Sequence, residues 1–248
     1  MDIIRVKSLD IGYGASVILK NLSFEIPRGE VTVVSGESGS GKSSLLKTLA
    51  GLIPPLSGEM YLAGERVDFF SEKSLRLLYQ KIGVLYQNSA MLNSMTLYEN
   101  VSLPIRMHHP DFPRQKEAEL VRAMLSRVGL QGGLDKYPFE LSGGMRKRAA
   151  LARAMVLDPE IVFCDEPSAG LDPITSAGLD ELLLDLKVKH GMTFVVITHE
   201  LRSIARIADR VLVLKDAAIN FAGRYQDAIA ARDPYLRAFF LREADHDH

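Results

Sequence analysis

A glycine-rich loop between an apolar run and a helical pattern constrains this chain more than any other feature. Residues 31–34 read Val-Thr-Val-Val, and residues 36–43 read Gly-Glu-Ser-Gly-Ser-Gly-Lys-Ser. The second stretch fits G-x-x-x-x-G-K-[ST], a pattern that needs a strand before it and a helix after it. We expect that helix over 41–50. Its N-terminus and the glycine N–H groups together would surround phosphate oxygens.

The loop also carries side chains with specific expected roles. Lys42 would reach the β- and γ-phosphates of a nucleotide, and the Ser43 hydroxyl would ligate Mg²⁺. The alternative is a Gly/Ser-rich turn without a ligand, which the strand–helix context disfavours. The candidate nucleotide-binding residues of the loop are Gly36, Glu37, Ser38, Gly39, Ser40, Gly41, Lys42, Ser43 and Ser44.

Three further polar side chains follow apolar strand patterns. Asp165 and Glu166 come directly after residues 161–164, and His199 follows residues 193–198. Ligands gather at the carboxyl ends of strands in open α/β sheets, so these side chains should meet the loop at one edge. Asp165 would hold Mg²⁺ and its water shell, Glu166 would polarise the attacking water, and His199 would contact the γ-phosphate. A polar strand exit and a structural histidine are the alternatives.

Composition excludes several classes of protein. The chain has 248 residues, with 30 basic and 31 acidic side chains and a net charge of −1, so coating nucleic acid is not its main role. No apolar run reaches the length of a membrane span, and the N-terminus lacks the layout of a secretion signal. The single cysteine, Cys164, excludes an internal disulfide framework and is expected to be a core residue of a cytoplasmic protein.

The remaining patterns predict an α/β protein with a mostly parallel sheet, because helical segments alternate with apolar strands. An antiparallel part is expected at the N-terminus, and Pro-interrupted helices over 88–157 are interpreted as an inserted lobe. A helix over 173–189 has Asp172 as its cap and Pro173 at its first position. The expected divisions are a nucleotide-binding core (1–87 and 158–222), the helical lobe (88–157) and a C-terminal extension (223–248), within one domain. Predicted strands cover 3–11, 22–26, 31–34, 58–67 as a hairpin, 82–86, 161–164, 193–198 and 211–214.

A second capped helix narrows the family. Leu141-Ser-Gly-Gly144 precedes apolar positions at 4-3-4 spacing, from Met145 to Val156. Ser142 is a natural N-cap, and the two glycines would expose first-turn N–H groups to an anion. Alone, this would be an ordinary helix start. Its position 23 residues before Asp165 sets it apart from an ordinary helix start.

These motifs, in this order, resemble the ATP-binding cassette (ABC) ATPases, P-loop proteins with a RecA-like core. Residues 36–43 match Walker A, 141–145 the signature, 161–166 Walker B and 168–172 the D-loop. The Q-loop glutamine corresponds to Gln87, the switch histidine to His199 and the adenine-stacking aromatic to Tyr13.

The resemblance implies an ATPase that uses ATP and Mg²⁺. Ser43, Gln87 and Asp165 would hold the metal, while Glu166 and His199 would be catalytic. Each ATP would lie between one subunit's Walker A loop and the partner's signature. A homodimer would therefore form, with Ser142, Gly143, Gly144 and Met145 contacting the ATP of the other subunit. Met145 departs from the usual glutamine, which leaves the helix-terminal donors in place.

A narrower resemblance concerns cargo. Residues 141–154, 165–183 and 94–104 are similar to the ATPases of Mla-type, MCE-protein-linked phospholipid transporters. That implies two permease subunits, an MCE-domain lipid-binding protein, a STAS-domain protein as a further partner, no nucleic acid, and a location on the cytoplasmic face of the bacterial inner membrane. An ABC ATPase for another cargo, such as amino acids or lipoproteins, is the alternative. A soluble cassette acting on ribosomes or DNA would normally carry two cassettes or coiled-coil insertions.

Three smaller features stay open at this point. Met91, Leu92, Met95 and Tyr98 would line the cleft for the permease or be buried in the helical lobe. The basic residues at 146, 147, 148 and 153 are expected to lie mostly on a solvated helix face, with Arg153 in a structural pair. Residues 233–241 would form a helix with an aromatic face that packs on its own domain or reaches a second copy.

Overall fold

Two sheets form the framework of the computed structural model, which describes residues 2–241. The antiparallel sheet has the order β2-β1-β4-β5. Its strands are β1 (Asp2–Tyr13), β2 (Ser16–Pro27), β4 (Ser57–Leu62) and β5 (Glu65–Arg66). β1 and β2 form a hairpin about the turn at Gly14 and Ala15, and a second turn at Ala63-Gly64 joins β4 to β5. The predicted N-terminal antiparallel part is confirmed.

The second sheet is mostly parallel and has the order β10-β9-β3-β8-β7-β6. Only the β9–β10 pair is antiparallel. The inner strands are buried along their length, which explains their continuous apolar runs. The strands are β3 (Val31–Gly36), β6 (Ile82–Leu85), β7 (Ile161–Asp165), β8 (Thr193–Ile197), β9 (Arg210–Lys215) and β10 (Ala218–Arg224).

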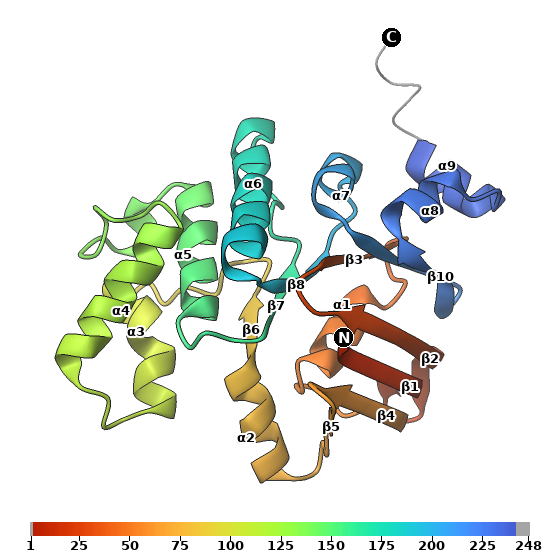
Figure 1. The fold of residues 1–248 in the computed structure, drawn as a ribbon, viewed down its shortest axis with the longest axis horizontal. Helices are drawn as coiled ribbons and strands as arrows, with labels where there is room; N and C mark the ends of the chain where they lie inside the picture. Colours follow the sequence, from red (N-terminus) through yellow and green to blue (C-terminus); the bar gives the residue numbers. More distant parts are fainter. Residues whose placement is uncertain (1, 242–248) are drawn as a thin grey trace.

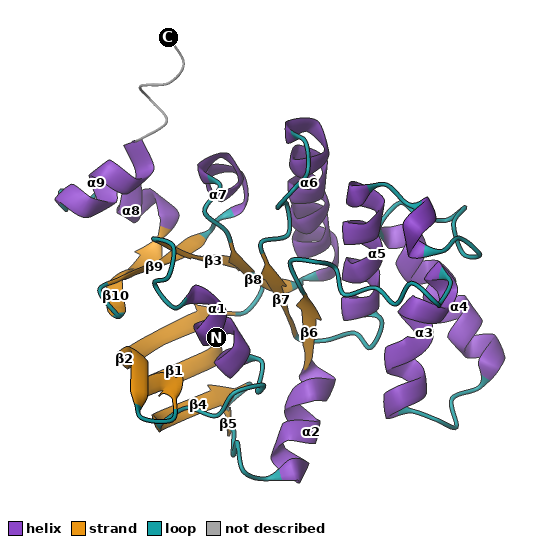
Figure 2. Cartoon of the chain, turned by 180° about the vertical axis from the view of Figure 1, so that it is seen from behind, coloured by secondary structure: helices purple, strands orange, loops and turns teal. Residues whose placement is uncertain are grey.

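Helices cover both faces of this parallel sheet (Figures 1 and 2). α1 lies between the two sheets, and α3, α4 and α5 form a helical group on the far side of α6 from it. The helices are α1 (Lys42–Leu49), α2 (Glu72–Lys81), α3 (Leu97–His108), α4 (Arg114–Arg127), a 3₁₀ turn (Pro138–Glu140), α5 (Gly143–Met155), α6 (Pro173–His190), α7 (Leu201–Ile207), α8 (Tyr225–Ala230) and α9 (Pro234–Leu241).

The core divides into two apolar clusters, one on each face of the parallel sheet. Alternate residues of one strand belong to different clusters: Val162 packs with the helices, while Phe163 packs with α1 and the antiparallel sheet. This follows from the period of two in a strand. The sheet is therefore a rigid central layer, and it holds the loops at the ends of its strands in fixed positions.

Helix starts agree with the capping signals. Asp172 accepts hydrogen bonds from the backbone N–H groups of Ile174 and Thr175 at the start of α6. α2, β10 and α8 were not among the predicted elements. α2 fully buries only Leu78, while Leu75 and Tyr79 are half-buried against the same cluster. Residues 88–157 contain α3, α4 and α5, and the division of the chain into core, lobe and extension stays a prediction. Residues 242–248 of the expected extension lie outside the described residues.

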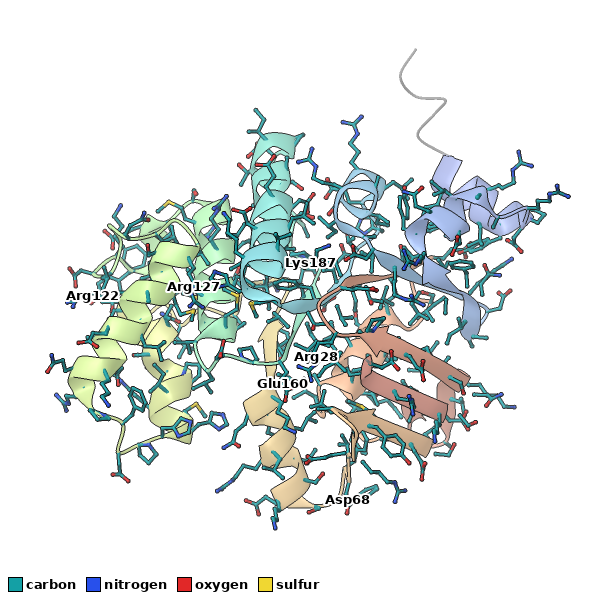
Figure 3. All side chains as sticks on the ribbon, viewed as in Figure 1. Arg28, Asp68, Arg122, Arg127, Glu160 and Lys187 are labelled. Atoms are coloured by element: carbon teal, nitrogen blue, oxygen red, sulfur yellow. The ribbon has the colours of Figure 1, made fainter. Side chains whose placement is uncertain are left out.

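Two ion pairs join segments that are distant in sequence (Figure 3). Arg28, just after β2, contacts Glu160, just before β7, at 2.5 Å. Lys187 of α6 contacts Asp209 at 2.8 Å, and the Asp209 carboxylate also accepts a hydrogen bond from the Val31 N–H. Asp209 thus fixes the start of β3, the strand that carries the phosphate loop. Within residues 2–241, no helix is both long and apolar enough to cross a membrane.

Cys164 is fully buried in β7, and burial raises the pKa of its thiol to about 12. Because the thiolate is the reactive form, the native protein should not react with a disulfide reagent at pH 8. We expect no labelling of the folded chain over an hour and complete labelling in guanidinium chloride. Absorbance of the released thiolate measures both. Rapid labelling of the native chain would contradict the buried position.

Candidate nucleotide site

Four motif segments meet at the carboxyl edge of the parallel sheet. β3, β8, β7 and β6 run in the same direction, and Val34 and Asp165 both align with Ile197. Gly36 ends β3 and Asp165 ends β7, while Gln87 and His199 lie two residues beyond β6 and β8. The predicted convergence of the loop, Asp165, Glu166 and His199 at one edge is confirmed.

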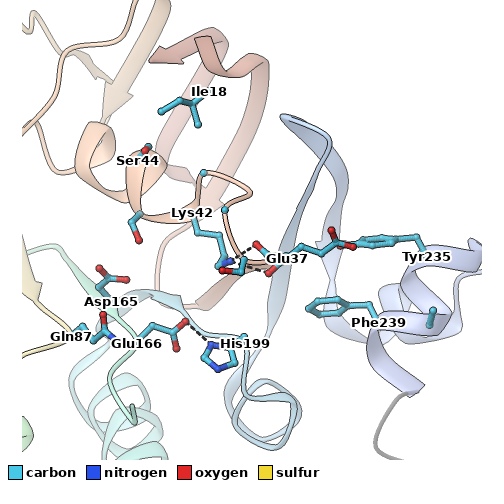
Figure 4. Close-up of a pocket in the computed structure, with 16 residues that line it drawn as sticks. Ile18, Glu37, Lys42, Ser44, Gln87, Asp165, Glu166, His199, Tyr235 and Phe239 are labelled. Atoms are coloured by element: carbon cyan, nitrogen blue, oxygen red, sulfur yellow. Dashed lines mark hydrogen bonds and ion pairs between the residues drawn. The ribbon is translucent and has the colours of Figure 1, made fainter. Parts of the chain in front are cut away.

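These segments enclose a cavity of about 930 Å³ (Figure 4). That is the upper part of the range for small-ligand sites. The cavity is lined by Ile18, Gly36, Glu37, Ser38, Gly39, Gly41, Lys42, Ser43, Ser44, Gln87, Asp165, Glu166, His199, Tyr235, Ala238 and Phe239. Most of the predicted nucleotide-binding, metal-binding and catalytic residues therefore surround one space.

Glycine is required at two positions of the loop. Gly36 has φ +144°, and a Cβ there would lie 2.3 Å from the Leu214 carbonyl oxygen. Gly41 precedes α1 in the left-handed conformation, with φ +95°. Any side chain at these positions would strain the loop or displace β9. The Ser40 hydroxyl is buried in the loop without a hydrogen-bond partner in the described residues, which fits a loop shaped for a ligand rather than for its own side chains.

Lys42 bends back over the loop. Its Nζ donates to the carbonyl oxygens of Gly36 and Glu37 at 2.9 and 2.8 Å. Burial lowers the pKa of Lys42, and the nearby carboxylates of Glu166 and Asp165 oppose that shift. The ammonium group thus faces the cavity with acceptors that a phosphate could replace.

Asp165 carries the carboxylate at the end of β7. Burial raises its pKa, and the charge of Glu166 raises it further, while Lys47, Lys147 and Lys42 lower it. A cation at this carboxylate would offset the burial. Ser43 and Gln87 line the same cavity, and all three offer oxygen atoms of the kind Mg²⁺ prefers. The donor set fits the metal.

Glu166 and His199 form a contact across the gap between β7 and β8. Glu166 Oε1 lies 2.8 Å from His199 Nδ1. Glu166 has a left-handed backbone with φ 44°, and its N–H donates to the Ile197 carbonyl at 2.9 Å. Left-handed backbone is uncommon outside glycine and marks constrained positions at functional sites. The sharp turn separates the Glu166 side chain from that of Asp165.

The predicted signature does not line this cavity. Ser142 caps α5 by accepting a hydrogen bond from the Met145 N–H at 3.3 Å. A Cβ on Gly144 would lie 2.4 Å from Thr175 Cγ2, so glycine lets α5 approach α6 closely. Ser142, Gly143, Gly144 and Met145 are absent from the cavity wall, and so is Tyr13, which is 49% exposed at the β1–β2 turn.

Part of the wall was missed by the sequence analysis. Tyr235, Ala238 and Phe239 of α9 line the cavity, and Tyr235 lies beside Glu37 of the loop (Figure 4). α9 packs on its own domain, with Leu236 buried and Phe240 edge-on to Tyr225. The aromatic face of residues 233–241 was recognised, but its position depends on a contact between segments about 200 residues apart.

The prediction that the basic residues of α5 lie on a solvated face is wrong for two of the four. Lys147 is only 5% exposed. Arg148 donates to the carbonyls of Val128 and Gly178. Arg146 is exposed as expected. Arg153 donates to the carbonyls of Ala90 and Ser89, which confirms its structural pairing.

Of the four residues suggested for a permease cleft, some are buried in the protein and others are accessible. Met91 and Tyr98 pack against the core, and the Tyr98 hydroxyl donates to Glu117 at 2.9 Å. Met95 is half-buried, while Leu92 is 42% exposed. Burial therefore accounts for two of the four.

Comparison with known proteins gives consistent relatives. The family model described as ABC transporter matches residues 19–169. The mkl protein of Mycobacterium leprae, a probable ribonucleotide transport ATP-binding protein, is 39% identical over 95% of this chain. The methionine import protein MetN of Carboxydothermus hydrogenoformans is 40% identical over 90% of it. This chain spans 68% and 67% of those two relatives.

The intermembrane phospholipid transport ATP-binding protein MlaF of Escherichia coli K12 is 36% identical over 98% of this chain and 90% of its own length. Among solved structures, cbiO1 of Clostridium perfringens has a TM-score of 0.86 and 28% identity, covering 98% of this chain and 99% of that one. The cassette MJ0796, solved as a dimer bound to ADP and phosphate, has a TM-score of 0.80 and 29% identity, covering 89% and 98%.

A parallel sheet with a phosphate loop, an acidic strand end and a facing histidine defines a nucleotide-hydrolysing protein. The chain belongs to the ABC transporter family. It is an ATP-binding ATPase of that family.

Proposed function

We propose that this chain is the ATP-hydrolysing subunit of a transporter that moves phospholipid between membranes. The observation that carries the proposal is the alignment with MlaF, which takes in 98% of this chain and 90% of that protein. The matches to mkl and MetN leave about a third of those proteins unaligned. The similarity of residues 141–154 and 165–183 to Mla-type ATPases supports the same subgroup.

The phosphate loop binds the ATP triphosphate in this proposal. Backbone N–H groups of Gly36 to Ser44 surround the phosphates, and Lys42 exchanges its loop carbonyls for the β- and γ-phosphate oxygens. Tyr13 stacks on the adenine from the β1–β2 turn, on the side where Ile18 lines the cavity. The N-terminus of α1 adds its dipole to the charge of Lys42.

Ser43, Gln87 and Asp165 would hold Mg²⁺ on the other side of the cavity. When bound, the metal supplies charge stabilisation to the phosphate oxygens. Asp165 contributes its charge, and the burial that raises its pKa keeps bulk water from weakening that charge.

Glu166 positions and polarises the attacking water, and His199 contacts the γ-phosphate. Their contact at 2.8 Å keeps the carboxylate turned toward the cavity. The left-handed backbone of Glu166 places its side chain away from the metal side held by Asp165. The two adjacent carboxylates can therefore have different roles, with Asp165 at the metal and Glu166 at the attacking water.

A second copy completes the site. Ser142, Gly143, Gly144 and Met145 lie outside the cavity of their own chain, so the N-terminus of α5 is placed to approach the γ-phosphate bound by a partner. Two copies then enclose two ATP molecules. MJ0796, a structural relative, was solved as a dimer.

This arrangement predicts nucleotide-dependent assembly. The isolated chain should be mostly monomeric without nucleotide, because ATP forms a large part of the proposed interface. Glu166→Gln with MgATP should accumulate as a dimer, since the nucleotide stays intact. Light scattering coupled to gel filtration gives both masses. A monomer under both conditions, also with the permease bound, would contradict the shared site.

The proposed partners follow from the same relative. Two permease subunits anchor the ATPase dimer at the cytoplasmic face of the inner membrane, an MCE-domain protein carries lipid on the far side, and a STAS-domain protein binds the ATPase. Amino acid transport is the second candidate, because MetN is 40% identical to this chain.

Cargo can be tested on the native complex. The ATPase is purified with its permease from membranes, and bound lipids are identified by mass spectrometry. An MCE-domain protein in the complex, together with phospholipid above the level of a control membrane protein, supports lipid transport. A periplasmic amino-acid-binding subunit, and ATPase activity stimulated by methionine, would instead support the second candidate.

A further inference from the structure

Helix α5 carries a buried lysine that reaches two motif segments at once. Lys147 is 5% exposed, and its Nζ donates to the backbone carbonyls of Gln87 and Glu166, the latter at 3.2 Å. These acceptors lie 60 and 19 residues away in sequence. One ammonium group therefore connects the segment after β6 with the turn after β7.

The backbone is strained at one of the two acceptors, Glu166, and shortly after the other, Gln87. Glu166 has φ 44°, and the two residues after Asn88, Ser89 and Ala90, have φ 60° and 47°. Such conformations persist in non-glycine residues only where the surroundings hold them. Arg153, six residues after Lys147 on α5, donates to the carbonyls of Ser89 and Ala90 at 2.8 and 2.7 Å. The strained carbonyls of both segments are thus held by cations of a single helix.

Apolar packing alone does not explain a lysine at this buried position. Burial lowers the pKa of Lys147, whereas the charges of Asp165 and Glu166 raise it. A methionine would fill similar space without desolvating a charge, so the hydrogen bonds and the nearby carboxylates must offset that penalty. What the lysine adds over an apolar residue is a directional link to two carbonyls.

We propose that Lys147 is a positioning residue that holds the Gln87 and Glu166 backbones in register with each other and with α5. The proposal rests on the proposed function, in which Gln87 lies on the metal side and Glu166 on the water side of the same ATP. α5 begins at the signature residues that face the partner's ATP. A shift of α5 on docking therefore moves the metal side and the water side of its own site together.

Three variants test this role in the full chain. Lys147→Met removes the donors at similar length, Lys147→Arg keeps a cation with donors, and Arg146→Met changes the exposed neighbour on the same helix. Hydrogen exchange of residues 86–92 and 165–169 is measured in the isolated chain, with and without ADP. Turnover and KM for ATP are measured in the assembled transporter.

Lys147→Met should accelerate exchange in both segments by at least about tenfold, because the links that close them are lost. Exchange in β3 and β8 should stay unchanged. Turnover should fall by about tenfold or more while KM changes by less than about threefold, as expected for lost positioning rather than lost binding. Lys147→Arg should restore at least half of the turnover, and Arg146→Met should behave as the parent.

Hydrogen exchange at the wild-type rate in both segments of Lys147→Met would overturn the proposal. An increase spread evenly over the sheet would also overturn it, because that result indicates only a loss of global stability. If Lys147→Met does not fold, Lys147→Gln replaces it. Its amide keeps two N–H donors on a shorter side chain, which should reach at most one of the two carbonyls, so exchange should accelerate in at least one segment. The exchange readout needs no cargo and no catalysis. A wild-type rate in Glu166→Gln would reject the role of Glu166 in hydrolysis on which the proposed function relies, whereas wild-type exchange in Lys147→Met would reject only the positioning role.

Discussion

Glu166→Gln should bind MgATP with nearly unchanged affinity and hydrolyse it about 10²–10⁴ times more slowly, the usual contribution of a general base. The side chain is 15% exposed, and its Oε1 faces His199 Nδ1 at 2.8 Å. Glutamine has almost the same shape, so the strained turn at φ 44° and its backbone links should persist. The group loses its basicity and its negative charge, while its shape is kept.

Single-turnover hydrolysis at full ATP occupancy in the assembled complex measures this effect, alongside nucleotide affinity from fluorescence titration. Glu119→Gln, on the exposed face of α4, is the matched control and should keep the parental rate. A structural carboxylate would instead show weaker ATP binding or lower stability at similar turnover per bound ATP. A loss of less than about tenfold would remove Glu166 from the catalytic role.

Lys42→Ala should abolish productive ATP binding. The ammonium group donates two hydrogen bonds in the loop, and charged hydrogen bonds of this kind contribute about 1.5–3 kcal/mol each. Transferred to phosphate oxygens, the pair would account for an affinity loss of about 10²–10⁴ at 1.4 kcal/mol per tenfold. In the free chain the two loop carbonyls would also lose their donor, which affects the stability of the loop rather than the affinity for ATP.

Equilibrium binding of a fluorescent ATP analogue to the isolated chain checks this prediction, and steady-state hydrolysis in the complex gives the second readout. Lys116→Ala, an exposed change on α4, controls for the loss of one positive charge. Thermal unfolding without nucleotide separates loop damage from lost phosphate contact. Parental affinity and turnover in Lys42→Ala would reject the phosphate-loop assignment.

The sequence alone determined the chemistry of the site and the edge at which it forms. The loop at 36–43 is contiguous, and its glycines are needed for local backbone reasons visible at Gly36 and Gly41. Asp165 and His199 could be assigned to the same edge because they follow buried strands, and parallel strands end together. Caps such as Asp172 and Ser142 could also be read from a few neighbouring residues.

Tertiary packing alone decided which other residues reach that edge. Tyr235 and Phe239 line the cavity because α9 folds back over the loop, a contact that no local pattern encodes. Lys147 was assigned to a solvated face because a charged residue on a helix is normally exposed. α5, however, packs against α3, α4, α6 and β6. A helix enclosed in this way buries polar positions as well, and their partners are backbone carbonyls brought close only by the assembled fold.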